Sequence, residues 1–161
     1  MATLRFRDPQ RTKYDFVADI LVTCPACGAA AHVAPLPGES LAGRSDRLFA
    51  ARRLTCPGCG HAKTWEGRAI ALSRSSVHPA TDPYFDLPLR LQAQTRHGWL
   101  WAYNHDHLTQ IERYVQATLR ERAPWYGSGI KMTLLARLPR WITSAKNREE
   151  ILRTIARIRA A

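Results

Sequence analysis

Two copies of one short cysteine motif constrain the fold of this chain more than any other feature of its sequence. Residues 24–28 and residues 56–60 both read C-P-x-C-G, and 28 residues lie between the inner cysteines of the two copies. A C-x-x-C turn places two sulfurs on one side of a metal, and zinc prefers four thiolates at the corners of a tetrahedron. The sequence therefore predicts one structural Zn²⁺ whose ligands are Cys24, Cys27, Cys56 and Cys59.

A redox or disulfide role is the alternative interpretation of these cysteines. A thioredoxin-like site needs one C-x-x-C motif in a βαβ setting, and disulfide scaffolds belong to secreted chains. Residues 1–19 carry no apolar signal segment, so we favour zinc. Because sulfur would fill all four coordination positions, we expect the metal to be structural rather than catalytic.

Extended segments flank both copies of the motif. Apolar and β-branched patterns predict strands over residues 16–23, 29–33, 48–55, 61–65 and 69–72. Strands that enter and leave two cysteine turns are typical of a zinc ribbon, which we place over residues 14–75 with three or four short strands. Residues 1–13 then form a basic N-terminal arm.

A second structural part is predicted over residues 84–161, after a proline-containing linker at residues 76–83. Residues 87–93 and 99–103 alternate like the strands of a hairpin. Three helices follow: one from Asn104 or Asp106 to about Arg122, one over residues 130–138 before Pro139, and one that opens near Ser144 or Asn147. The predicted fold class is α+β, with an N-terminal zinc ribbon, a hairpin and about three helices.

Two registers of this hairpin lead to different functional interpretations. If only His97 and Gly98 form the turn, Trp101 lies opposite Gln94 on a polar face where bases could stack. If Arg96 also belongs to the turn, Trp101 lies opposite Ala93 and the aromatic side chains join the leucine face as core. The second register is favoured, because large aromatic side chains are usually buried.

The charge of the chain points to a polyanionic partner. The sequence has 24 Lys and Arg against 13 Asp and Glu, which gives a formal net charge of +11. Such an excess favours nucleic acid first, and an acidic protein or anionic lipid second. No apolar run is long enough to span a bilayer, so we expect no membrane association and a cytoplasmic location.

The last helix carries an apolar stripe and a basic ridge. Projection at 100° per residue puts Ile151, Leu152, Ile155 and Ile158 on one side. Lys146, Arg153 and Arg157 fall on the opposite side; this ridge either binds a polyanion or only keeps the helix soluble. The predicted nucleic-acid-binding residues are Lys146, Arg153, Arg157, Arg90, Arg96, Trp99 and Trp101.

The cysteine motifs and three later segments of the chain resemble known proteins. The two C-P-x-C-G motifs are similar to those of zinc ribbons of the transcription-factor-IIB type. The runs D-P-Y-F at residues 82–85, L-W-A-Y-N at residues 100–104 and W-I-T-S-A-K-N-R at residues 141–148 resemble bacterial zinc-ribbon proteins of uncharacterised function. The resemblance implies a four-thiolate zinc fold that binds nucleic acid or docks on polymerase-like assemblies.

Three functional classes follow from these observations. We expect a non-catalytic nucleic-acid-binding protein, an accessory or regulatory factor in DNA or RNA transactions. The alternative is an adaptor that docks on an acidic protein through the ribbon and the basic helices. An enzyme is disfavoured, because no nucleophile, paired-carboxylate or phosphate-loop pattern is present; a site built from Asp82, Asn104 and His105 is the form it could take. His105 and His107 could bind a metal together with His97, but no carboxylate or thiol signature joins them, so we expect solvated or capping histidines.

Overall fold

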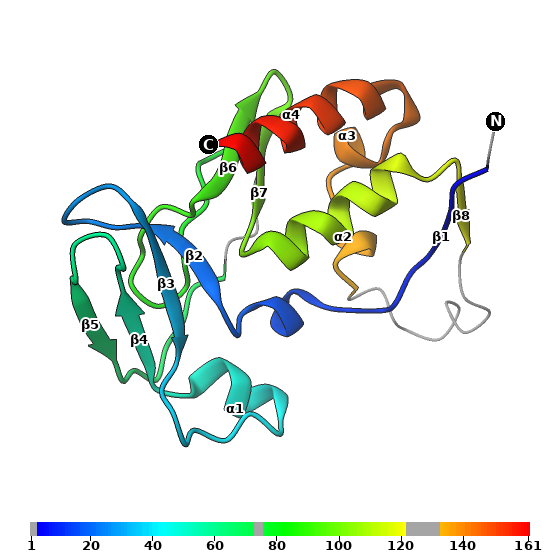
Figure 1. The fold of residues 1–161 in the computed structure, drawn as a ribbon. Helices are drawn as coiled ribbons and strands as arrows, with labels where there is room; N and C mark the ends of the chain where they lie inside the picture. Colours follow the sequence, from blue (N-terminus) through cyan, green and yellow to red (C-terminus); the bar gives the residue numbers. More distant parts are fainter. Residues whose placement is uncertain (1–2, 73–75, 122–132) are drawn as a thin grey trace.

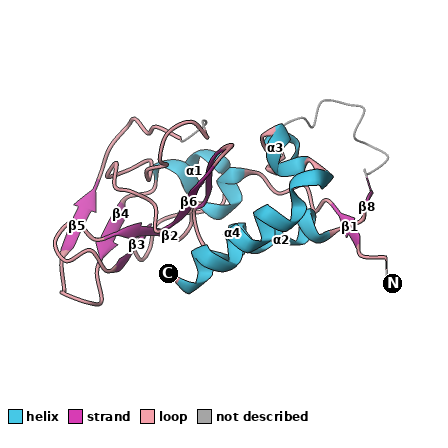
Figure 2. Cartoon of the chain, turned by 90° about the horizontal axis from the view of Figure 1, so that it is seen from above, coloured by secondary structure: helices cyan, strands magenta, loops and turns pink. Residues whose placement is uncertain are grey.

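The computed structural model describes residues 3–72, 76–121 and 133–161. Over these ranges the chain is a mixed α+β protein with three small sheets (Figure 1). Viewed from above, a four-stranded sheet lies at one end, a two-stranded sheet lies at the other, and two helices run side by side between them (Figure 2).

The four-stranded sheet contains both cysteine motifs. Its strands are antiparallel in the order β2-β3-β4-β5. They span Ile20–Thr23 (β2), Ala30–Pro35 (β3), Arg52–Thr55 (β4) and Ala62–Trp65 (β5). The two motifs form the β2–β3 and β4–β5 turns, so the sheet brings them to the same end.

Three expectations for this region need correction. Residues 13–16 form a short 3-10 helix (η1, Lys13–Phe16) before β2 begins. A helix (α1, Arg44–Phe49) precedes β4, where an extended segment was expected from residue 48. Residues 69–72 form no strand.

The remaining elements include a hairpin, a small parallel sheet and the main helices. The strands are β6 (Leu91–Thr95) and β7 (Gly98–Ala102), and β1 (Arg5–Arg7) pairs in parallel with β8 (Leu119–Glu121). The helices are α2 (His105–Gln116), α3 (Arg140–Thr143) and α4 (Arg148–Ala160), with 3-10 turns η3 (Leu135–Arg137) and η4 (Ala145–Asn147).

The helix after Asn104 is shorter than predicted. It ends at Gln116 rather than near Arg122. The backbone N–H groups of Thr118 and Leu119 donate to the carbonyl of Leu4, so the chain leaves the helix to pair with β1. This partner lies more than 100 positions away in the sequence, and local periodicity carries no information about it.

The other two predicted helices also differ in detail. The helix expected over residues 130–138 begins outside the described residues, and its described remainder contains only the turn η3. Asn147 occupies the N-cap position of α4, but its side chain donates to the carbonyl of Trp141 and does not cap the helix. The predicted apolar stripe of α4 is confirmed, since Ile151, Ile155 and Ile158 are buried.

One hydrophobic cluster joins the four-stranded sheet to the hairpin and helices. Val22 and Leu54 from the sheet belong to the same cluster as Leu89, Ile111 and Ile155. Backbone hydrogen bonds cross the same boundary, because β2 pairs with residues 88–90 and with the carbonyl of Tyr103. The predicted boundaries after residues 13, 75 and 83 stay predictions, but the parts they separate share a core.

Two buried polar side chains, Asp82 and Arg52, lie at the boundary between these parts. The Asp82 carboxylate accepts backbone N–H bonds from Tyr84, Phe85 and Leu87 at 2.8–2.9 Å. Arg52 is fully buried, donates to two backbone carbonyls and lies 4.2 Å from the centre of the Tyr84 ring. Asp82 is therefore used to shape a loop, and this use explains its burial.

A helix needs about 20 mainly apolar residues to cross a bilayer. None of the helices within the described ranges combines that length with that composition.

Candidate metal centre and basic groove

The four cysteine sulfurs lie together, as the motif spacing predicted. All four Sγ atoms are within 4.8 Å of one another; Cys24 and Cys59 are 3.8 Å apart, and Cys27 and Cys56 are 3.6 Å apart. A tetrahedral zinc with Zn–S bonds of about 2.3 Å separates its sulfurs by about 3.8 Å. The cluster can therefore hold one metal ion, and its dimensions fit zinc.

The two turns that supply the sulfurs have the same backbone geometry. In each, the first cysteine donates its N–H to the carbonyl five residues later, and the motif glycine donates to the carbonyl of that cysteine, all at 2.8–2.9 Å. Gly28 and Gly60 both have φ of 75°. A side chain is strained in that conformation, which explains why each motif ends in glycine.

The same geometry excludes a disulfide in this arrangement. A disulfide bond is about 2.05 Å long, and all four cysteines are free thiols. Cys24 and Cys56 are buried, whereas Cys27 and Cys59 are exposed. A metal bound by all four sulfurs has no vacant coordination position, so such an ion serves the fold rather than chemistry on a substrate.

Three of the predicted nucleic-acid-binding residues line one groove. Its volume is about 680 Å³, and it lies between the tip of the β6–β7 hairpin and α4. Its lining residues are Gln94, Thr95, Arg96, Glu150, Arg153, Thr154 and Arg157. We call this feature the basic groove.

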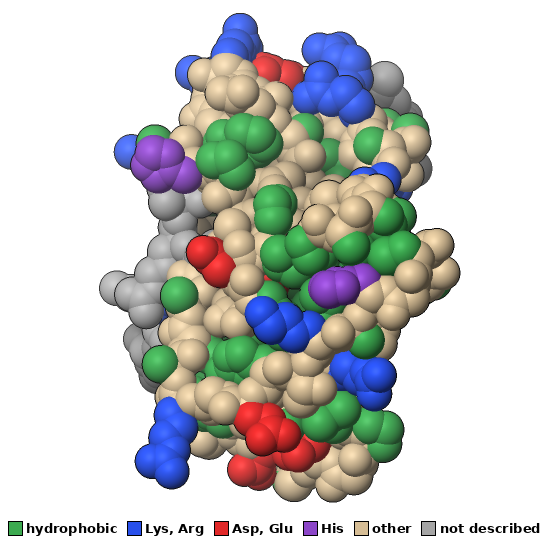
Figure 3. All heavy atoms as spheres, turned by 90° about the vertical axis from the view of Figure 1, so that its left-hand side faces the viewer, with side chains coloured by type: hydrophobic (Ala, Val, Ile, Leu, Met, Phe, Trp, Pro, Cys, Tyr) green, Lys and Arg blue, Asp and Glu red, His purple; other side chains and the backbone are tan. Residues whose placement is uncertain are grey.

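The basic groove contains an acidic residue that sequence reasoning did not select. Glu150 Oε2 lies 2.9 Å from Arg96 Nη2 and 3.5 Å from His97 Nε2. From the sequence alone, Glu149 and Glu150 are two acidic residues near the start of the last predicted helix, where acids interact favourably with the helix dipole. Which of them faces the groove depends on how the hairpin docks on α4. Figure 3 shows acidic atoms between two groups of positive side chains at the top, the end at which Figure 1 places the hairpin tip.

The other predicted basic residues lie elsewhere. Arg90 donates to the carbonyls of Gly28 and Ala161 at 3.3 and 2.9 Å, and it lines a second groove of about 630 Å³ between the four-stranded sheet and the helices. Lys146 is exposed on η4 and does not line the basic groove.

The hairpin has neither of the two registers considered from the sequence. Arg96 and His97 form a two-residue turn, so Trp101 lies opposite Gln92 and Trp99 lies opposite Gln94. Gly98 has φ of 142°, and a Cβ on it would lie 2.6 Å from the carbonyl oxygen of Ser76. The close approach of the Ser76 carbonyl therefore requires glycine at the residue after the turn.

The tryptophans share a face with the glutamines but are not freely displayed. Trp99 and Trp101 are half-buried. Trp101 packs edge-on against Tyr103 and His107, with ring centres 5.1 and 5.7 Å apart. The Gln92 side chain accepts the backbone N–H of Ala80 and donates to its carbonyl, in the segment before the hairpin.

The histidines near the start of α2 do not form a metal site. Within the described residues, only the four cysteines group closely enough to hold an ion. His107 is buried, stacks on Phe16 at 4.8 Å and accepts the Tyr103 N–H at Nδ1. Burial lowers its pKa to about 3. His107 is thus a neutral core residue, whereas an exposed or capping role was expected.

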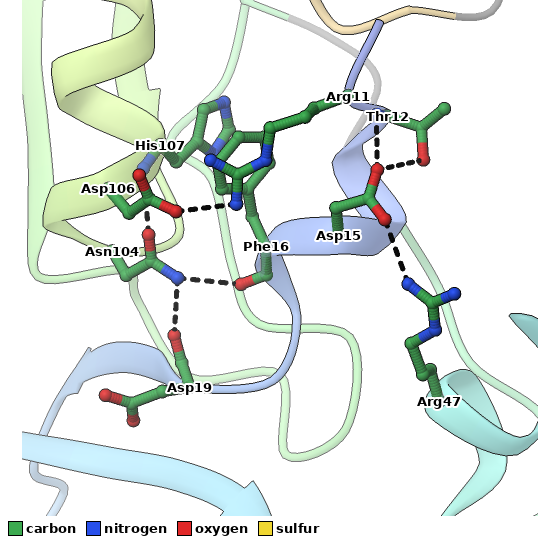
Figure 4. A network of polar contacts seen from close by, with 9 residues as sticks. All are labelled: Arg11, Thr12, Asp15, Phe16, Asp19, Arg47, Asn104, Asp106 and His107. Atoms are coloured by element: carbon green, nitrogen blue, oxygen red, sulfur yellow. Dashed lines mark hydrogen bonds and ion pairs between the residues drawn. The ribbon is translucent and has the colours of Figure 1, made fainter. Parts of the chain in front are cut away.

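Asn104 and its neighbours connect α2 to the segment before β2 (Figure 4). The Asn104 side chain caps α2 by accepting the His107 N–H, as predicted, and it donates to the carbonyls of Phe16 and Asp19. Asp106 pairs with Arg11 at 2.6 Å. These side chains are occupied in holding the two segments together.

Comparisons of the chain with protein-family models, with curated proteins and with solved structures find no match.

Proposed function

We propose that the chain is a zinc-ribbon protein that binds nucleic acid through the basic groove and acts as a non-catalytic accessory or regulatory factor. The observation that carries the proposal is the position of Arg96, Arg153 and Arg157. They come from a hairpin turn and from a helix, and they line one groove. A groove with several arginines matches the spaced negative charges of a phosphate backbone.

In this proposal, zinc supports binding indirectly. The four thiolates hold the two turns of the four-stranded sheet, and β2 of that sheet pairs with the segment that leads into the hairpin. The resemblance of the C-P-x-C-G motifs to zinc ribbons of the transcription-factor-IIB type supports the same role. The chemistry of the site is therefore recognition, with the metal as a structural element.

The dependence of affinity on salt tests this proposal. The triple variant Arg96→Gln/Arg153→Gln/Arg157→Gln removes the positive charges of the basic groove. Each lost phosphate contact should flatten the plot of log affinity against log salt by about 0.7 to 0.9, whatever the base sequence. Affinities for single- and double-stranded DNA and RNA at several salt concentrations provide the plots.

A second triple variant with the same loss of charge is the control. Arg53, Lys63 and Arg68 are exposed on or beside the four-stranded sheet. Their replacement by glutamine should change the slope much less than the groove variant does. Equal slopes for the two variants would show that net charge alone determines binding, and that the basic groove is not the binding site.

An adaptor for an acidic protein is the second candidate. The observation in its favour is that Trp101 packs against Tyr103 and His107, which leaves the arginines as the main recognition groups. Arginine binds carboxylates in the same bidentate manner as phosphates. Tight, salt-sensitive binding to an acidic protein and weak binding to every nucleic acid tested would establish this second candidate.

A further inference from the structure

We propose that the basic groove is a phosphate-binding site in which the Glu150 carboxylate occupies the place of a phosphate while the protein is free. This inference rests on the proposed function and adds that the Glu150 carboxylate competes with phosphate for Arg96. Glu150 pairs with Arg96 at 2.9 Å inside a groove that Arg153 and Arg157 also line. Carboxylate and phosphate oxygens bind the same guanidinium donors, so a phosphate that reaches Arg96 must displace Glu150.

The position of Glu150 distinguishes it from its neighbour. The Glu150 side chain is 25% exposed and has two positively charged or titratable partners from the hairpin turn, Arg96 and His97. Glu149 is 91% exposed, lies 3.8 Å from Arg153 on its own helix and does not line the groove. The two residues share the first turn of α4, so both favour the helix N-terminus. Both pair with an arginine of the groove, but only Glu150 lies inside the groove, and its pair is the shorter and less exposed of the two.

The charges of the groove support the same conclusion. Its lining contains three arginines and one carboxylate, so it is positive even with Glu150 in place. Arg96 is the most exposed partner of that carboxylate, at 72% of its side chain. An exposed ion pair is weak, and a polyanion with several phosphates can replace it. Because the Glu150 carboxylate competes with the first phosphate for Arg96, a ligand with one phosphate gains little. A ligand that also presents phosphates to Arg153 and Arg157 gains more, so the groove favours polyanions.

Two single variants test the inference. Glu150→Gln and Glu149→Gln each remove one negative charge from the first turn of α4. Glu150→Gln should tighten the binding of a single-stranded oligonucleotide by up to about fivefold at low salt, the change expected from removing one exposed ion pair. Its salt slope should stay close to that of the wild type, because Arg96 contacts a phosphate in both complexes once Glu150 is displaced. Glu149→Gln should tighten binding much less, because Glu149 lies outside the groove and its pair with Arg153 is longer and more exposed.

Arg96 links the effect to the groove. In the Glu150→Gln background, Arg96→Gln should remove the whole gain in affinity, whereas in the wild-type background the same change should have a smaller effect. Thermal unfolding of each variant checks that the fold is kept. Binding by the wild type with equal shifts for Glu150→Gln and Glu149→Gln would overturn this inference and leave the proposed function standing. If none of these proteins bound nucleic acid in a salt-dependent way, both this inference and the proposed function would be wrong. If Glu150→Gln increased the affinity only for an acidic polypeptide, both would also be wrong, and the adaptor would be supported.

Discussion

His107 shows how one residue can have opposite meanings in sequence and structure. In the sequence it lies two positions from His105 at a helix start, where exposed or capping histidines are common. In the structure its ring is buried against Phe16, and its Nδ1 accepts a backbone N–H. The neutral ring with a proton on Nε2 satisfies this contact, and a charged ring could not accept the bond.

The buried ring makes stability depend on pH. Its pKa is about 3 in the folded protein because burial disfavours the charged form, against about 6.5 when unfolded. The unfolded chain therefore binds more protons between these values, and stability falls as pH falls from about 6.5 towards 3. We expect a loss of about 1.4 kcal/mol for each pH unit within this window.

The variant His107→Asn isolates this contribution, because its amide oxygen can accept the same N–H without titrating. It should be less stable than the wild type at pH 7, and the difference should shrink as pH is lowered to 4.5. Urea unfolding followed by circular dichroism gives the free energies. His105→Asn, on an exposed position, is the control and should keep the acid sensitivity. If His107→Asn kept the same acid sensitivity as the control, the claim that a neutral, buried His107 causes the loss of stability in acid would be wrong.

Predictability from sequence also differs between single residues. The four cysteines could be assigned because the turn geometry is local and recurs at both motifs. Asn104 could be assigned as a helix cap for the same reason. Glu150 could not be selected over Glu149, since its role depends on a hairpin more than 50 positions earlier in the chain.

At the scale of elements, local patterns predicted the strands beside the cysteine turns and the buried face of α4. They failed where a distant segment determines a boundary. The chain after Gln116 leaves α2 to pair with β1, and Gly98 after the hairpin turn packs against Ser76. Each of these contacts is long-range or lies across a turn, so neither propensity nor periodicity reveals it.

The four-stranded sheet is the element whose stability should depend on metal. The binding energy of a structural zinc is folding energy, so Cys24→Ser should lose the metal and lower the melting temperature. We expect a decrease of roughly 10 °C or more, since each kcal/mol shifts the melting temperature of a domain this size by about 2–4 °C. Elemental analysis should find one zinc in each wild-type chain.

Ala26→Ser replaces a residue of the same turn that is not one of the four cysteines. This variant should still bind one zinc and melt at the wild-type temperature. A quadruple Cys→Ser protein that melts at the wild-type temperature would contradict a structural role for the metal.

At the scale of the whole molecule, the four-stranded sheet, the hairpin and the helices share one hydrophobic cluster. The basic groove lies between two of these elements, so its shape depends on how they pack together. A metal bound by the four cysteines of the sheet should therefore affect the groove through this common core. The sequence indicated each part and its charge, but the groove exists only where the parts meet.

The most direct test of the basic groove as a nucleic-acid-binding site is to locate the nucleic acid on the folded protein. Titration of the ¹⁵N-labelled protein with a short single-stranded oligonucleotide at low salt reports on each backbone amide in turn. We predict shifts of the amides around the basic groove, at Thr95, Arg96, Arg153 and Arg157, and unchanged amides in β4 and β5. Shifts confined to the four-stranded sheet, or none at saturating oligonucleotide, would contradict it.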